Sequence, residues 1–469
     1  MTDLNRRLSR RQALKGAAGA SAALGLAPLI AACGGSSSTT SSAASAATSA
    51  AATPSTSAPA AGGKITIGSF QDNALAPLRD VFFKRFETET GIHVDYVETD
   101  YNSWYQKAKT DGLQKTGAYD VYIMDDNWVP EFAAGNIIKN LDEIGFKANP
   151  DILAKGLEQG YWPPKSGARL ADFKDATPAL YAIVIIDDVE ILYYNHDYFP
   201  TAPKTWDDIY NVAKTKAQPP TLYGWSARGV KGNPIVQTYL PLLTAYGGSF
   251  AQDDWRPGFA GPEGVGALAR LFEFIPYMPT GVAEFDTDQE VQVLLEGKCT
   301  ALTEYTGLSH RIDDPASSKV VGKIDCAATP AQEKSGPAIG TFICGVASGA
   351  QNTDSAVKFL EWFTSEQVQI DFARDGGSAA VTGKALSDSQ AVAKYRWLPA
   401  IADAVNNSVP KPRTPDEPKM EDILGTACNE ALVEAIQKKT GYTAIAQAHL
   451  TKAANDITAF LKQQGGYGI

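Results

Sequence analysis

The feature that most constrains the fold is an alternation of strand and helix periodicities over residues 64–134. Residues 64–68 alternate between apolar and polar side chains, which predicts a strand, and the next apolar residues recur at helical spacing up to Gly91. Further strands are predicted at residues 92–97 and 119–124, each after a helical stretch. Strands that alternate with helices form a mostly parallel sheet covered by helices, so the sequence predicts an α/β fold.

Polar residues follow the first and the third of these predicted strands. Asp72 and Asn73 come after the first strand, and Asp125 and Asp126 end the third. Open α/β sheets bind ligands beyond the carboxyl ends of their strands, so we expect these side chains to face one crevice and to contact a ligand. The alternative is that Asp126 only caps the helix that follows it.

The first 32 residues have the pattern of an export signal. Basic residues precede a short apolar run rich in Gly and Ala, which is too short to be a good membrane span. The pair Arg10 and Arg11 resembles a twin-arginine signal, but the general secretory route stays open because Ala13 stands where that pattern prefers a larger apolar residue. The run ends with Ile-Ala-Ala before Cys33, which is similar to the lipobox of bacterial lipoproteins. We expect removal of residues 1–32 and lipidation of Cys33.

Residues 33–63 form a second compositional region. After Cys33 they are almost wholly Gly, Ser, Thr, Ala and Pro, with too little bulky apolar surface to offset the entropy of ordering the chain. A flexible chain of this length reaches about 30 Å. The sequence therefore predicts an exported globule that a disordered linker and a lipid hold at the outer face of the cell membrane, or on the periplasmic side.

Charge and composition exclude several classes of protein. The chain has 42 Lys+Arg against 53 Asp+Glu, a net charge of −11, whereas a protein that binds nucleic acid needs a basic footprint. We therefore expect no nucleic-acid partner. The chain has four histidines and neither a His-Glu-x-x-His nor a Cys-x-x-Cys motif, so we expect no metal site and no cofactor.

Four cysteines follow Cys33 in the sequence: Cys299, Cys326, Cys344 and Cys428. In an exported chain they permit disulfides, with three possible full pairings. Three of them lie in apolar runs, where they could equally be buried thiols. The sequence leaves both alternatives open.

Several short patterns, taken in their order along the chain, resemble a known family. They include residues 86–94, the Pro-Lys-Thr-Trp-Asp-Asp-Ile run at 203–209, residues 296–302 and the apolar helical face within 356–363. In this order they resemble the extracellular solute-binding proteins of carbohydrate ABC transporters, and the resemblance covers residues 64–469.

The resemblance implies a two-lobed, periplasmic-binding-protein-like fold of type II with a hinge and a central ligand cleft. Lobe 1 would comprise residues 64–183 and 323–375, and lobe 2 residues 190–320 and 378–469. The β-branched run at 182–186 would be one hinge crossing. Such a protein captures a small sugar or sugar alcohol and delivers it to membrane permease subunits, and we expect it to be a monomer without catalytic activity.

The resemblance also implies which side chains contact the sugar. Asp72, Asp126 and Asp188 fall where the maltose-binding branch of the family has carboxylates that accept hydrogen bonds from sugar hydroxyls. Aromatic rings stack on the C–H faces of sugars. The candidate rings are Trp128, Trp225, Tyr305 and Phe342.

Residues 223–234 look more like the branch that binds sugar alcohols and monosaccharides. Arg228 lies there near glycines, and we expect its guanidinium to enter the cleft and donate to two hydroxyl oxygens. Leu308 stands where the family places a stacking Trp. We therefore expect a small ligand rather than a long oligosaccharide.

An exported carbohydrate-active hydrolase that uses cleft carboxylates is the alternative function. Glycoside hydrolysis needs an acid and a base about 5–9.5 Å apart across the bond that is cut. The candidate acids here occur as two pairs of sequence neighbours, Asp125-Asp126 and Asp187-Asp188. This arrangement favours binding, and we expect no catalytic residue.

Overall fold

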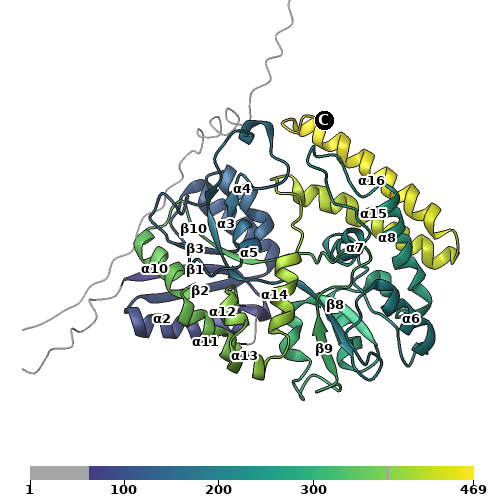
Figure 1. The fold of residues 1–469 in the computed structure, drawn as a ribbon. Helices are drawn as coiled ribbons and strands as arrows, with labels where there is room; N and C mark the ends of the chain where they lie inside the picture. The colour runs from purple at the N-terminus through teal and green to yellow at the C-terminus, as the bar shows by residue number, and fades with distance from the viewer. Residues whose placement is uncertain (1–62, 377–379) are drawn as a thin grey trace, which may run out of the picture. The chain divides into compact units, whose positions relative to one another are not determined.

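Two larger β-sheets organise the part of the chain that the computed structural model describes, residues 63–376 and 380–469 (Figure 1). The expected signal at residues 1–32, the lipidation site Cys33 and nearly all of the expected linker lie outside the described residues. We call the elements around the five-stranded sheet the first lobe and those around the three-stranded sheet the second lobe.

The five-stranded sheet has the order β2-β1-β3-β10-β6. Strand β1 is parallel to β2 and β3, as the alternating periodicities predict, while β10 is antiparallel to both β3 and β6. Strands β3, β10 and β6 are almost completely buried, because helices cover the sheet. The strands are β1 (Lys64–Phe70), β2 (His93–Thr99), β3 (Val121–Asp125), β6 (Ala182–Ile186) and β10 (Phe342–Val346).

The helices of the first part of the chain begin and end where local signals place them. Helix α2 ends at Gly91, whose φ of 73° is the left-handed conformation that glycine adopts without strain. Helix α3 begins after Asp100, whose carboxylate accepts a 2.9 Å hydrogen bond from the amide of Ser103. These elements are η1 (Asn73–Leu75), η2 (Leu78–Phe82), α2 (Phe83–Thr90), α3 (Tyr101–Gln114), η3 (Asp126–Trp128), α4 (Val129–Ala134) and α5 (Ala154–Glu158), with β4 (Tyr161–Trp162), η4 (Ala171–Phe173) and β5 (Ala179–Leu180) before β6.

The three-stranded sheet corrects one expected boundary. Its order is β8-β7-β9, and both neighbours of β7 (Glu190–Asn195) run antiparallel to it. Strand β9 (Ile324–Ala327) pairs with β7, so residue 323 does not begin the return to the first lobe. The chain re-enters the five-stranded sheet only at β10. The remaining strand is β8 (Ala301–Tyr305).

The chain passes between the two sheets along two adjacent extended segments, residues 187–189 and 338–341. The amide of Gly340 donates to the carbonyl of Asp188 at 2.9 Å, and the amide of Glu190 donates to the carbonyl of Ala338 at 3.1 Å. The run at 182–186, which was expected to be a hinge crossing, is instead the buried strand β6 of the five-stranded sheet, and the first crossing begins only after it.

Helices α7, α8, α15 and α16 pack against one another in the second lobe, and α15 and α16 lie side by side (Figure 1). The Lys-Thr-Trp-Asp pattern is a helix start: Thr205 accepts from the amide of Asp208, whose carboxylate accepts from the amide of Thr205. The helices after β7 are α6 (Trp206–Lys216), α7 (Asn233–Ala245), α8 (Pro262–Glu273), η5 (Ile275–Tyr277), η6 (Val282–Glu284), α9 (Thr287–Leu295), η7 (Thr306–Arg311), α10 (Thr353–Phe363), α11 (Glu366–Gly376), α12 (Gly383–Leu386), α13 (Ser389–Lys394), α14 (Leu398–Asn407), α15 (Glu417–Lys438) and α16 (Tyr442–Gln464).

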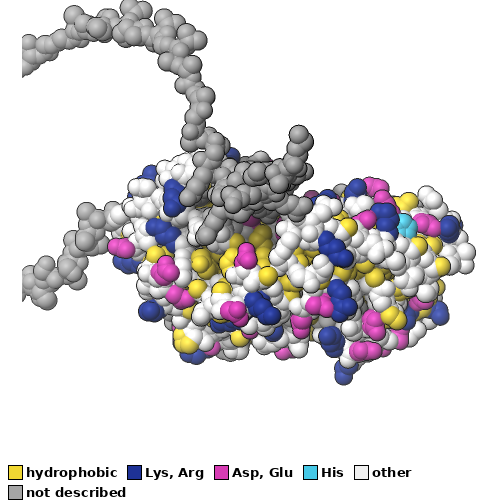
Figure 2. Space-filling view, turned by 90° about the horizontal axis from the view of Figure 1, so that it is seen from above, with side chains coloured by type: hydrophobic (Ala, Val, Ile, Leu, Met, Phe, Trp, Pro, Cys, Tyr) yellow, Lys and Arg dark blue, Asp and Glu magenta, His cyan; other side chains and the backbone are white. Residues whose placement is uncertain are grey.

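Acidic and basic side chains are interspersed on the face of the described chain that Figure 2 shows. Within residues 63–376 and 380–469, no helix combines the length and the apolar character that crossing a membrane requires.

The four cysteines of the described chain are free thiols: Cys299, Cys326, Cys344 and Cys428. Of the two alternatives that the sequence left open, the structure therefore shows unpaired thiols and no disulfide among these four residues.

Candidate ligand-binding site

The carboxyl ends of β1 and β3 bring predicted acidic residues together. Asp125 accepts a 2.9 Å hydrogen bond from the hydroxyl of Tyr101, and the exposed Asp72 accepts from the amide of Ala74 at 2.7 Å. Partial loss of hydration raises the pKa of the Asp72 carboxyl, and the charge of Asp125 raises it further, while the hydrogen bond from Ala74 lowers it. Asn73 lies in the turn after β1, but its side chain lies outside the described part of the structure.

Asp126 lies beside the crossing segments, because its amide donates to the carbonyl of Thr341 at 3.1 Å. Its side chain is only 4% exposed, and its Oδ2 accepts a 2.9 Å hydrogen bond from Arg413. Its Oδ1 has no hydrogen-bond partner in the described chain. Burial raises the pKa of Asp126 to about 7, although the charge of Arg413 opposes this shift. No side-chain cap joins Asp126 to the helix that follows, so capping does not explain its position.

Asp188 lies on the first crossing segment itself. Its carboxylate accepts a 2.5 Å hydrogen bond from the hydroxyl of Thr306. Burial raises the pKa of Asp188 to about 8; the hydrogen bond from Thr306 lowers it, and the charges of Asp72 and Glu304 add to the increase. Asp72, Asp188 and Glu304 therefore lie within electrostatic reach of one another. We call the region around Asp72, Asp125, Asp126 and Asp188 the junction.

The predicted rings Trp128 and Phe342 are buried beneath another aromatic residue. The indole Nε1 of Trp128 donates to the hydroxyl of Tyr101 at 3.0 Å, and the rings of Phe342 and Tyr101 lie 5.0 and 5.3 Å from that of Phe70. Tyr101, which is 39% exposed, is the ring of this cluster that solvent reaches. The prediction of a stacking role therefore moves from Trp128 and Phe342 to Tyr101, a residue that sequence reasoning missed.

Trp225 does not reach the junction. Its side chain is 0% exposed, and its ring lies 4.9 Å from Phe274 and 5.3 Å from Trp206. These rings form part of the core of the second lobe, so the expected stacking of Trp225 on a ligand is wrong for this structure. In the sequence, Trp225 stands in a glycine-containing segment, and this pattern does not show whether its ring lies in the core or on the surface.

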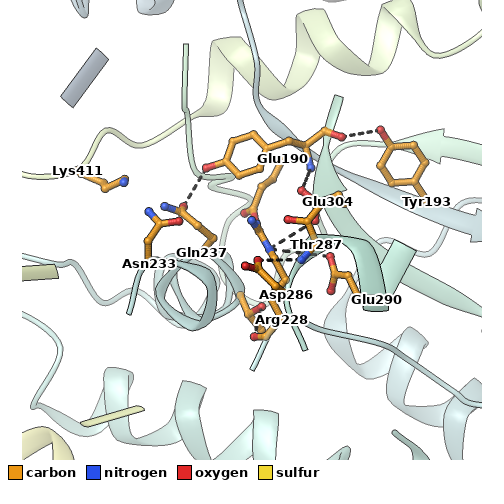
Figure 3. A network of polar contacts seen from close by, with 12 residues as sticks. Glu190, Tyr193, Arg228, Asn233, Gln237, Asp286, Thr287, Glu290, Glu304 and Lys411 are labelled. Carbon is orange, nitrogen blue, oxygen red and sulfur yellow. Dashed lines mark hydrogen bonds and ion pairs between the residues drawn. The ribbon is translucent and has the colours of Figure 1, made fainter. Parts of the chain in front are cut away.

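Arg228 is enclosed by carboxylates of its own lobe (Figure 3). Its guanidinium donates to Glu190 at 3.3 Å and lies 3.4 Å from Glu304 and 3.9 Å from Glu290. Burial raises the pKa of Glu190 to about 8, and the charge of Glu304 adds to this, while the charge of Arg228 lowers it. We call these four residues the carboxylate cage. The expected donation from Arg228 to a ligand is therefore corrected, because its donors face these acids.

Tyr305 is held from three sides at the end of β8. Its hydroxyl donates to Gln237 at 2.9 Å, and the guanidinium carbon of Arg228 lies 5.4 Å from its ring centroid. A Cβ at Gly340 would lie 2.9 Å from the ring, so only glycine fits there without a shift. Tyr305 stays partly accessible and is the one predicted ring whose position suits a ligand platform.

Residues 408–416, between α14 and α15, contribute cations that sequence reasoning missed. Lys411 pairs with Glu421 of α15 at 2.9 Å, and Glu421 also accepts from Gln237 at 3.3 Å (Figure 3 labels Lys411 and Gln237). Arg413 pairs with Asp126, as described above. In the sequence, Lys411 and Arg413 stand in a proline-rich stretch. Such a stretch does not show which part of the fold its side chains contact.

Two surface cavities lie elsewhere. One of about 210 Å³ is lined by α15 and α16, and one of about 480 Å³ by residues 254–257 with α16 and the C-terminus. No predicted site residue lines either cavity. The junction therefore remains the region that collects the predicted polar residues.

Three comparisons place these features among known proteins. A solute-binding protein of Agrobacterium radiobacter K84, solved with ribitol, has a TM-score of 0.71 and 24% identity, over 86% of this chain and 100% of that chain. Maltose-bound MalE3 of T. maritima has a TM-score of 0.72 and 18% identity, over 85% and 100%. A probable amino-acid ABC transporter periplasmic-binding protein of Sinorhizobium fredii is 24% identical over 394 residues, 76% of this chain and 85% of that protein.

These structural similarities confirm the periplasmic-binding-protein-like α/β fold. The family model of bacterial extracellular solute-binding proteins matches residues 71–370, which is more than half of the chain. Members of that family are not enzymes, so the hydrolase alternative is set aside. The chain belongs to the bacterial extracellular solute-binding proteins.

Proposed function

We propose that this protein is the substrate-binding subunit of an ABC importer and that it captures a small sugar or sugar alcohol at the junction. The observation that carries the proposal is the meeting of carboxylates Asp72, Asp125 and Asp188 with the rings of Tyr101 and Tyr305. Carboxylates accept several hydrogen bonds from vicinal hydroxyls, and aromatic rings pack on the C–H faces of sugars and polyols. The similarity to proteins solved with ribitol and with maltose supports this ligand class.

The residues have distinct roles in this proposal. Asp72, Asp125 and Asp188 accept hydroxyl hydrogen bonds, and Asp126 offers its unpartnered Oδ1. Tyr101 from the first lobe and Tyr305 from the second pack against the ligand. The two lobes close around the ligand by rotation at the crossing segments.

The N-terminal part of the proposal concerns location. Export, lipidation of Cys33 and a linker to residue 63 would hold the protein on the outer face of the membrane, where it would deliver its ligand to permease subunits. Cys33→Ala should leave the precursor unlipidated, which mass spectrometry of membrane fractions would detect. Wild-type protein that is wholly soluble and untethered outside the cell would contradict this part of the proposal.

A ligand screen tests the ligand class. Thermal unfolding of the purified chain is measured with ribitol, D-mannitol, maltose and a set of amino acids, followed by calorimetry of each compound that stabilises. A true ligand at 100 times its Kd adds about 2.7 kcal/mol to the free energy of unfolding and binds once per chain. Stabilisation by amino acids but by no sugar or polyol would overturn the sugar assignment.

A further inference from the structure

Residues 408–416 are attached to the second lobe. The amide of Val409 donates to the carbonyl of Pro337 at 3.0 Å, and Lys411 pairs with Glu421 of α15. Helix α15 packs on α7 and α8, which belong to the second lobe. The backbone at Arg413 therefore belongs to the second lobe.

The guanidinium of Arg413 makes its described hydrogen bonds with the first lobe. Nη1 donates to both the carbonyl oxygen and Oδ2 of Asp126, each at 2.9 Å, and Nη2 donates to the carbonyl of Gln159. Asp126 follows β3 and Gln159 follows α5, which packs on β6. Arg413 is buried, so water competes little for these bonds. One side chain thus joins the two lobes at the position of a predicted ligand acceptor.

The contacts of Arg413 also fix what Asp126 can offer. Its Oδ2 is occupied by Arg413, while Oδ1 is buried without a partner in the described chain. A buried acceptor without a donor is unfavourable, so a donor hydrogen placed there is bound strongly. Holding Oδ2 leaves Oδ1 in one defined orientation.

We propose that Arg413 is a positioning residue that couples closure to ligand capture, because it clasps the second lobe to Asp126 and orients Oδ1 of Asp126 toward the hydroxyl of a ligand. The clasp is a property of the protein alone. The orientation of Oδ1 toward a hydroxyl rests on the proposed function.

Other groups contribute to the same region and must be considered in a test. Asp125, Lys411 and Glu417 all act electrostatically on Asp126 or on its pair with Arg413. The amide of Asn127 also reaches Glu417 at 3.4 Å. Removal of Arg413 leaves these groups in place, so its effect can be separated from a general loss of charge.

The clasp is tested without any ligand. Small-angle scattering compares wild type, Arg413→Gln and Arg413→Lys with the control Arg270→Gln, whose arginine pairs with Asp207 at 2.6 Å and Glu273 at 2.7 Å within the second lobe. We expect a larger radius of gyration for Arg413→Gln, an intermediate one for Arg413→Lys, which keeps the charge but lacks the fork, and no change for Arg270→Gln. Equal radii for all folded variants would overturn the clasp. Because Arg413→Lys retains the cation, it decides the question if Arg413→Gln does not fold.

The orientation of Asp126 is tested by the pH dependence of binding to ribitol and D-mannitol. Arg413 lowers the pKa of Asp126, so in Arg413→Gln the pH below which affinity falls should move upward from about 7, while Arg270→Gln keeps the wild-type profile. Asp126→Asn should abolish this step. An unmoved profile in Arg413→Gln would overturn the positioning role. If neither polyol binds wild type, the ligand assignment fails, and the scattering result still decides the clasp.

Discussion

Two buried arginines, Arg228 and Arg413, differ in where their partners come from. Arg228 faces Glu190, Glu290 and Glu304, all from its own lobe, so its ion pairs persist whichever way the lobes rotate. The partner of Arg413 belongs to the opposite lobe. In the proposed closure, a buried ion pair therefore changes with the ligand only when its two members lie on different lobes. The glycines near Arg228 in the sequence did not indicate that its partners come from its own lobe.

The largest expected effect is on stability, from Arg228→Ala. The change leaves the carboxylates of the cage without their cation, and breaking a buried ion pair typically costs about 3–5 kcal/mol. Denaturant unfolding should show this loss, and the loss should be smaller at pH 5, where protonation relieves the repulsion between the acids. A variant as stable as wild type at pH 8 would show that the cage does not depend on its arginine.

The next effect is on binding, and it contrasts the junction with the cage. Asp125→Ala should weaken ribitol or D-mannitol binding at least about tenfold, because hydrogen bonds to charged groups contribute about 1.5–3 kcal/mol. Glu290→Gln, in the cage, should leave the affinity unchanged. Calorimetry of the two variants is the measurement. Equal losses in both would remove the distinction between the two regions.

The junction acid Asp188 should contribute to the pH dependence of stability, beside the cage acid Glu190. Asp188 has a pKa of about 8, above its value in the unfolded chain, so the folded state holds the proton more tightly. Its contribution is present below pH about 4 and is lost as the pH rises toward 8, with a slope of at most about 1.4 kcal/mol per pH unit. Asp188→Asn should flatten the pH profile of the free energy of unfolding. An unchanged slope would assign the titration to other groups.

The smallest effect is expected from Tyr305→Phe. This change removes the hydrogen bond to Gln237 and keeps the ring beside Arg228. A single neutral hydrogen bond contributes about 0.5–1.5 kcal/mol, so ligand affinity should fall no more than about tenfold. Tyr305→Ala, which removes the platform, should cost more in calorimetry. If both variants bind as wild type does, the ring is not part of the ligand site.

The parts of the fold that sequence predicted are those set by local patterns. The strands around residues 64–70, 93–99 and 121–125 follow from alternation, and Gly91 ends its helix as expected. The family resemblance placed residues 323–375, and with them strand β9, in lobe 1, whereas β9 pairs with β7 of the second lobe; its four residues carry too little periodicity to correct that boundary.

The site was predictable only where topology alone places a residue. Asp125 and Asp126 lie at the end of a strand, so their location follows from the sheet. Burial by other layers was not predictable: Trp128 and Trp225 are both covered by rings from other segments. Arg413 meets Asp126 across 287 positions of sequence, a contact that no local pattern encodes.

The two crossing segments have a mechanical consequence. The amides of Gly340 and Glu190 tie them to each other at two points, so the two segments form one short ribbon between the sheets. Asp188 lies within this ribbon, whereas Arg413 lies in residues 408–416, outside it. In the proposed closure, a ligand bound to Asp188 is therefore held at the connection between the two lobes, and both walls of the site turn toward it.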